Sequence, residues 1–156
     1  MTWIEKAKEA IINSSLESSV YIGCDSDRYK KNGAWYIRYA TCIILHKDSK
    51  HGALIFHNTV IERDWSNSLR QKLMTEVQHA INAALEVIDV VGDRHIEVHL
   101  DINKSEKHKS NIAMKEALGY VKGTLGLDAK LKPFSFAAAH AADHLCRGKS
   151  LRNKSN

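Results

Sequence analysis

The hydrophobic pattern of this chain changes period part of the way along, and this change restricts the possible folds more than any other feature. Residues 19–26, 34–46 and 51–62 are rich in β-branched and aromatic side chains and are separated by polar turns, which predicts three consecutive antiparallel strands. From residue 66 to residue 89 the apolar side chains recur at intervals of three and four, the spacing of one helix face. Ser66 or Asn67 is expected to cap this helix.

Strand and helix patterns alternate after this first long helix. Residues 95–102 and 128–132 alternate polar and apolar side chains and predict strands, whereas residues 107–125 and the alanine-rich residues 135–147 predict helices. A shorter amphipathic helix is predicted at residues 3–13. Strand–helix–strand units imply parallel pairing, so the expected fold class is α/β, with a mixed five-stranded sheet and flanking helices.

Length and composition predict one ordinary globular domain. The chain has 156 residues with one proline and eight glycines, and it contains no repeat or linker. We expect an N-terminal amphipathic helix at residues 1–17, a core domain at residues 18–147 and a basic flexible tail at residues 148–156. No apolar run reaches the roughly 20 residues of a membrane span, and the charged N-terminus differs from a signal peptide, so a cytoplasmic protein without a membrane partner is expected.

Cysteine spacing and net charge narrow the classes of function further. Cys24, Cys42 and Cys146 are far apart and form no CxxC pair, which predicts free thiols instead of a disulfide or a zinc site. The net charge of +5 suits a polyanion partner such as nucleic acid. The chain is expected to be a monomer or a homodimer, because Trp3 in the N-terminal helix can pack on the domain or pair two chains.

Four carboxylates lie at positions that the predicted strands and helices could bring together at one edge of the sheet. Asp25 ends the first strand in VYIGCDSD, and Asp101 ends the fourth strand in VHLDIN. Ligands of open α/β sheets collect beyond the carboxyl ends of strands. Glu76 borders the core-facing stripe of the first long helix, and Asp143 lies among alanines in the last helix.

Four carboxylates that converge from distant segments repel one another unless cations lie among them. Oxygen-only ligand sets favour Mg²⁺ or Mn²⁺, and two such ions can promote cleavage of a phosphodiester bond. The sequence contains no GxSxG, P-loop or GxGxxG motif that would favour other chemistry. The acids therefore predict a metal-dependent hydrolytic site.

The element order and the four acids resemble the ribonuclease H-like superfamily. The segments YIGCDSD, HLDIN and KPFSFAAAHAADHLCR are similar to those of its bacterial YkuK-type family, and the resemblance covers roughly residues 18–147. It implies a nuclease that acts on the RNA strand of RNA–DNA hybrids by a two-metal mechanism. In that resemblance the two Mg²⁺ or Mn²⁺ ions are held by Asp25, Glu76, Asp101 and Asp143.

Three alternatives stay open. His140 stands one helical turn before Asp143, which is similar to the RuvC-type Holliday-junction resolvases and would make His140 a ligand or a proton shuttle for a dimeric enzyme. A non-catalytic module that binds nucleic acid or protein would keep the fold without the activity. A 3′–5′ exonuclease usually has a histidine five residues before the last aspartate, and that position here is Ala138.

Basic and aromatic side chains near the acids predict contacts with nucleic acid. If the acids form a nuclease site, lysines and arginines close to them in sequence would contact phosphates. Asp27 is expected to lie in the turn that follows the first strand. Trp35 and Tyr36 begin the second strand, where core packing is the expected role and stacking on a base is the alternative. The predicted phosphate contacts are Arg28, Lys30, Lys104, Lys107, Lys109 and Arg147.

Overall fold

The computed structural model describes residues 1–49, 52–103 and 110–132. The order of its elements confirms the predicted α/β class. The predicted helix at residues 135–147 and the predicted tail at residues 148–156 lie outside the described residues. The elements are α1 (Trp3–Ile12), β1 (Ser19–Lys31), β2 (Ala34–His46), the short 3₁₀ helix η1 (Lys47–Ser49), β3 (Ala53–Arg63), α2 (Leu69–Val91), β4 (His95–Asn103), α3 (Ser110–Leu125) and β5 (Lys130–Lys132).

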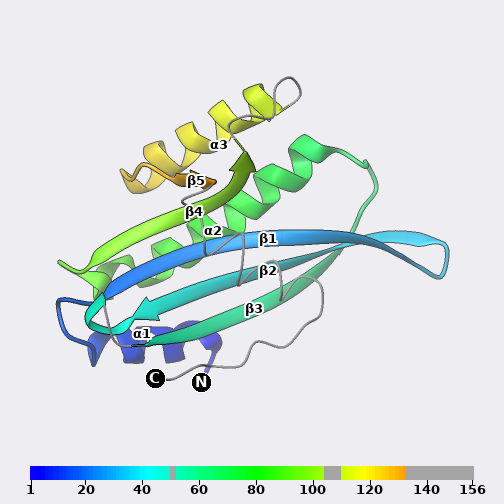
Figure 1. Cartoon of the computed structure of the whole chain (residues 1–156). Helices are drawn as coiled ribbons and strands as arrows, with labels where there is room; N and C mark the ends of the chain where they lie inside the picture. The colour runs from blue at the N-terminus through cyan, green and yellow to red at the C-terminus, as the bar shows by residue number, and fades with distance from the viewer. Residues whose placement is uncertain (50–51, 104–109, 133–156) are drawn as a thin grey trace.

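The strands form one mixed five-stranded sheet in the order β3-β2-β1-β4-β5 (Figure 1). β1 pairs with β2, and β2 with β3, in antiparallel fashion, while β1 with β4 and β4 with β5 are parallel. The chain moves from β1 outward through β2 to β3, and then returns by α2 to the other side of β1. The boundary between β1 and β4 is therefore the point where the strand order reverses.

The first strand is longer than the sequence pattern predicts. A strand at residues 19–26 would end just after Asp25, but β1 continues to Lys31, so the prediction that Asp25 ends the strand is wrong. The reason is a tight hairpin, in which Lys31 pairs with Ala34 across the two-residue turn Asn32–Gly33. Both turn residues have positive φ, at 52° and 80°. Asn-Gly is the preferred sequence for a hairpin turn of this kind.

Two further expectations about this part of the chain are wrong for the same reason. Asp27 does not lie in a turn, because it pairs with Arg38 across the two long strands. Trp35 is 38% exposed and does not belong to the core, since it lies next to the hairpin turn where β2 has only β1 as a neighbour. The hairpin extends beyond the rest of the sheet (Figure 1).

Helix α2 begins at a serine that differs from the two predicted caps. Ser68 has an extended backbone, and its hydroxyl accepts a hydrogen bond from the Gln71 amide at 3.2 Å. Asn67 has a φ of 49°, which differs from the extended conformation that a capping residue adopts. Ser66 instead donates its hydroxyl hydrogen bond to the Gln71 side chain. The cap defines the residue at which α2 begins.

All three helices contribute to one buried cluster on one face of the sheet. From α1 it takes Ala7 and Ile11, neither of which has exposed surface, and Trp3 packs against it, so α1 is part of the same core. A smaller cluster on the opposite face is formed by Ala40, Cys42 and Ile44 of β2. Members of the large cluster from the other elements include Val20, Ile22, Cys24, Ile43, Leu45, Val77, Ala80, Ile81, Ala84, Val98, Ala117 and Val121.

The two described cysteines are free and buried, as predicted. Burial raises the pKa of the Cys42 thiol to about 12, so this thiol stays neutral at physiological pH. Cys146 lies outside the described residues. None of the helices in the described part of the chain is long and apolar enough to cross a membrane.

Candidate acidic site between β1 and β4

Two of the predicted acids lie at the same level of neighbouring parallel strands. The pairing of β1 with β4 runs from Ser19 opposite His95 to Gly23 opposite His99. Asp25 is two residues beyond Gly23, and Asp101 is two residues beyond His99. The parallel register therefore carries both backbones to the same distance past the last paired residues, at the boundary where the strand order reverses.

The third acid reaches β1 from the helix above it. Glu76 of α2 is 7% exposed, and its Oε1 accepts a hydrogen bond from the hydroxyl of Ser26. Lys72, one turn earlier in α2, places its Nζ 3.9 Å from the same oxygen and donates to the Ser26 carbonyl at 3.4 Å. The ammonium partly compensates the buried carboxylate, which would otherwise be costly to ionise.

Asp25 and Glu76 lie on opposite faces of β1. Successive side chains of a strand alternate between faces, and Ser26 faces α2, so Asp25 faces the other way. Its cross-strand partner Ala40 belongs to the small cluster on that opposite face. Asp25 is 8% exposed, and its Oδ1 accepts a hydrogen bond from the Ser26 amide at 2.8 Å.

Both acids act on Cys24, the residue that precedes Asp25 in β1. Burial raises the pKa of the Cys24 thiol well above its ordinary value, and the charges of Glu76 and Asp25 raise it further. Burial, with the charges of Glu62 and Glu76, raises the pKa of the Tyr39 hydroxyl to about 12. The thiol and the phenol next to the acids are therefore neutral at physiological pH.

Within the described ranges, no three histidine, cysteine, aspartate or glutamate side chains lie close enough together to hold a metal ion. Asp101 is described here only by its backbone position in β4. Asp143 and His140 lie outside the described residues. The described structure thus brings Glu76 to Ser26 and Lys72, and brings Asp25 and Asp101 to one level of the sheet.

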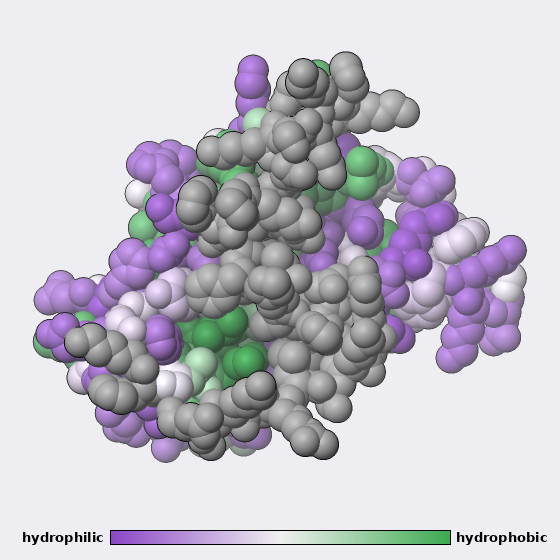
Figure 2. All heavy atoms as spheres, viewed as in Figure 1, coloured by the Kyte–Doolittle hydropathy of each residue, from purple (hydrophilic) through white to green (hydrophobic). Residues whose placement is uncertain are grey.

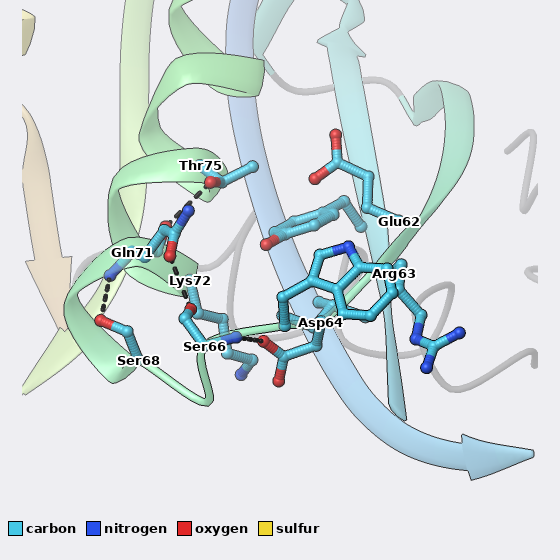
Figure 3. A pocket seen from close by; sticks show the side chains of 11 residues that line it. Glu62, Arg63, Asp64, Ser66, Ser68, Gln71, Lys72 and Thr75 are labelled. Atoms are coloured by element: carbon cyan, nitrogen blue, oxygen red, sulfur yellow. Dashed lines mark hydrogen bonds between the residues drawn. The ribbon is translucent and has the colours of Figure 1, made fainter. Parts of the chain in front are cut away.

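A small polar cavity of about 120 Å³ adjoins this region. Its walls come from β2, the end of β3, the following loop and the first turns of α2, and Figure 3 shows the polar side chains that line it. Lys72 belongs both to this wall and to the contact with Glu76. Glu62 of β3 lies across the cavity, and Thr75 lies further along α2 on the same side as Lys72. The cavity is therefore a polar approach to the buried acid of the helix.

The predicted phosphate contacts fall into two groups. Arg28 forms an ion pair with Asp64 and lowers the pKa of that carboxyl group below its usual value. Lys30 is exposed near the end of the hairpin. The remaining predicted contacts lie outside the described residues, namely Lys104, Lys107, Lys109 and Arg147.

Sequence reasoning missed two residues that contact the predicted acids. Ser26 is not among the predicted site residues, yet its hydroxyl donates a hydrogen bond to Glu76. Side chains of a strand alternate between faces, so Ser26 faces the side of the sheet opposite to Asp25, which α2 covers. This period of two is the sequence signal that could have identified Ser26. Lys72 stands four residues before Glu76, and residues at that spacing in a helix are neighbours.

The sheet order and the alternation of strands and helices define the chain as an α/β protein with a mixed five-stranded sheet. A family model described as ribonuclease H-like matches residues 2–147, and the chain belongs to the ribonuclease H-like family. No curated protein and no solved structure gives a match. The narrower resemblance to the YkuK-type branch stays a prediction.

Proposed function

We propose that the protein is a metal-dependent nuclease that hydrolyses phosphodiester bonds, with the RNA strand of RNA–DNA hybrids as its substrate. The observation that carries the proposal is the common level of Asp25 and Asp101 on two parallel strands where the strand order reverses. Glu76 of α2 is a third acid. Its buried carboxylate is bound by Ser26, the residue that follows Asp25 in β1. Membership of the ribonuclease H-like family supports the same class of reaction.

The chemistry of these donors suits Mg²⁺ or Mn²⁺. Asp25 and Glu76 are less than one tenth exposed and offer only oxygen ligands, which hard divalent cations prefer. Two bound ions would lower the pKa of an attacking water and stabilise the leaving 3′-oxygen. We propose that Asp25, Glu76, Asp101 and Asp143 hold them. Because Glu76 approaches β1 from the face opposite to Asp25, its carboxylate would have to turn from Ser26 toward Asp25 to share an ion with it.

The RuvC-like alternative differs in two respects that can be measured. It requires a homodimer, because a resolvase cuts two strands of a junction symmetrically, and it makes His140 a further ligand. A non-catalytic binding module would keep the same fold. Nucleic acid is the partner in each of the two nuclease proposals.

We expect the protein to cut an RNA–DNA hybrid in the presence of Mn²⁺ or Mg²⁺ and to leave single-stranded RNA and a four-way DNA junction intact. The three substrates carry the same labelled sequence, and each is incubated with either metal or with chelator. Products are resolved on a denaturing gel. Cleavage of the junction alone would replace the proposal with the resolvase, and no cleavage of any substrate with either metal would leave the binding module.

A further inference from the structure

We propose that the outer β1–β2 hairpin, together with the end of β3, is a binding site for single-stranded nucleic acid. We call this site the hairpin arm and define it as residues 28–38 with Arg63 and Trp65. It goes beyond the proposed nuclease reaction, because none of its residues is one of the proposed metal ligands.

Charge is the first reason for the proposal. Residues 28–38 contain Arg28, Lys30, Lys31 and Arg38 and no acidic residue, and of these cations Arg28 is paired with Asp64. Arg63 at the end of β3 adds a further exposed cation next to this segment. The hairpin at the right of Figure 2 is mainly hydrophilic on the face shown. Such a strip of positive charge complements a polyanion.

Aromatic rings alternate with these cations in a continuous row. Tyr29 and Tyr36 pair across the strands and stack with ring centroids 5.8 Å apart. The Arg38 guanidinium lies 4.8 Å from the Tyr29 ring at one end of this pair. At the other end Arg63 lies between two rings, 5.5 Å from that of Tyr36 and 4.3 Å from that of Trp65.

The exposure of these rings is not explained by packing of the fold. Trp65 is 82% exposed and Trp35 is 38% exposed, and neither belongs to a buried cluster. Arg28 and Lys30 lie over the Trp35 ring on the opposite face of the hairpin, at 3.8 and 5.9 Å. Exposed aromatic rings held beside cations are the groups that bind unpaired bases and phosphates together.

Single strands fit this surface better than duplexes. A base stacks on a protein ring only when it is not stacked and paired within a helix, so exposed rings favour unpaired nucleotides. Asp25, Asp27 and Tyr29 share one face of β1 because they are two residues apart. Four residues of strand separate Asp25 from Tyr29 by about 13 Å. A strand bound on the arm can thus continue to the acidic site, and this continuation alone rests on the proposed function.

The test measures binding without cleavage. Fluorescence anisotropy is recorded with a labelled 20-nucleotide oligouridylate and with a duplex of equal length, both in chelator. We expect the single strand to bind at least about tenfold more tightly than the duplex, and Trp65→Ala to weaken it about five- to fiftyfold. Ile112→Ala is the matched control, since Ile112 is also strongly exposed, at 71%, but lies on α3.

Salt dependence separates the two kinds of contact. Arg63→Gln should lower the slope of log K against log salt by about 0.7, the value for one lost phosphate contact on a single strand, whereas Trp65→Ala should leave the slope unchanged. Lys6→Gln on α1 is the charge control. Wild-type affinity in both arm variants, or equal competition by polyglutamate of matched charge, would overturn the proposal. Because chelator is present throughout, binding is scored whether or not the protein is a nuclease.

Discussion

Asp25→Asn is expected to lower metal-dependent cleavage by about 10²- to 10⁴-fold, the range found when a group that stabilises transition-state charge is removed. The substitution removes the negative charge but keeps the shape of the side chain. Its remaining carbonyl oxygen can still accept the hydrogen bond that the Ser26 amide now gives to Oδ1. We therefore expect the folded structure to persist and the loss to appear in the rate of cleavage.

The measurement is an initial rate on the RNA–DNA hybrid at saturating Mn²⁺, with the circular dichroism spectrum and the melting temperature as checks on folding. Asp27→Asn is the matched control, because Asp27 lies on the same face of the same strand but pairs with Arg38. The control should keep its rate within about threefold, well short of the loss expected for Asp25→Asn. Equal rates in wild type and Asp25→Asn would remove Asp25 from the catalytic site.

Ile43→Ala is expected to lower the free energy of unfolding by about 2–5 kcal/mol, and Ile43→Val by about 0.5–1.5 kcal/mol. Ile43 has no exposed surface and lies in the central part of β2, opposite Ile22 of β1 and Phe56 of β3. Removing its side chain leaves a cavity between the sheet and the helices, and the packed surroundings can relax only in part.

Urea unfolding followed by circular dichroism measures both variants. Ile61→Ala is the matched control, because Ile61 also lies in a strand but is 53% exposed. A change within about 0.5 kcal/mol is expected there. If the Ile43 and Ile61 variants lost stability equally, the large cluster would not be the main source of stability for this sheet.

The element order could be predicted from the change in hydrophobic period, because a meander followed by helical crossovers has few topologies. The extent of β1 could have been predicted as well. The Asn32–Gly33 pair is a strong hairpin signal, and it lies between two segments with strand-forming residues. A hairpin turn predicted at Asn32–Gly33 would have placed Asp25 within the strand and Trp35 next to the turn.

The contacts around Glu76 were harder to foresee. That Glu76 borders the core follows from helical spacing, but its bond to Ser26 depends on how α2 packs across the sheet, which the local sequence does not specify. The exposure of Trp35 has a similar origin. The pairing of β1 with β4 ends at Gly23, so the outer hairpin lacks a third strand on that side, and local sequence does not specify where parallel pairing stops.

The most direct test of the account is a titration of the wild-type protein with Mn²⁺, followed by electron paramagnetic resonance and by the melting temperature, beside the same titration of Asp25→Asn. With the proposed two-metal site, the wild type binds two ions per chain and melts at a higher temperature in millimolar metal, because ligands that bind the folded state stabilise it. The variant should bind fewer ions and gain less. A wild-type protein that binds no Mn²⁺ and melts at the same temperature with and without metal would contradict a metal-dependent acidic site.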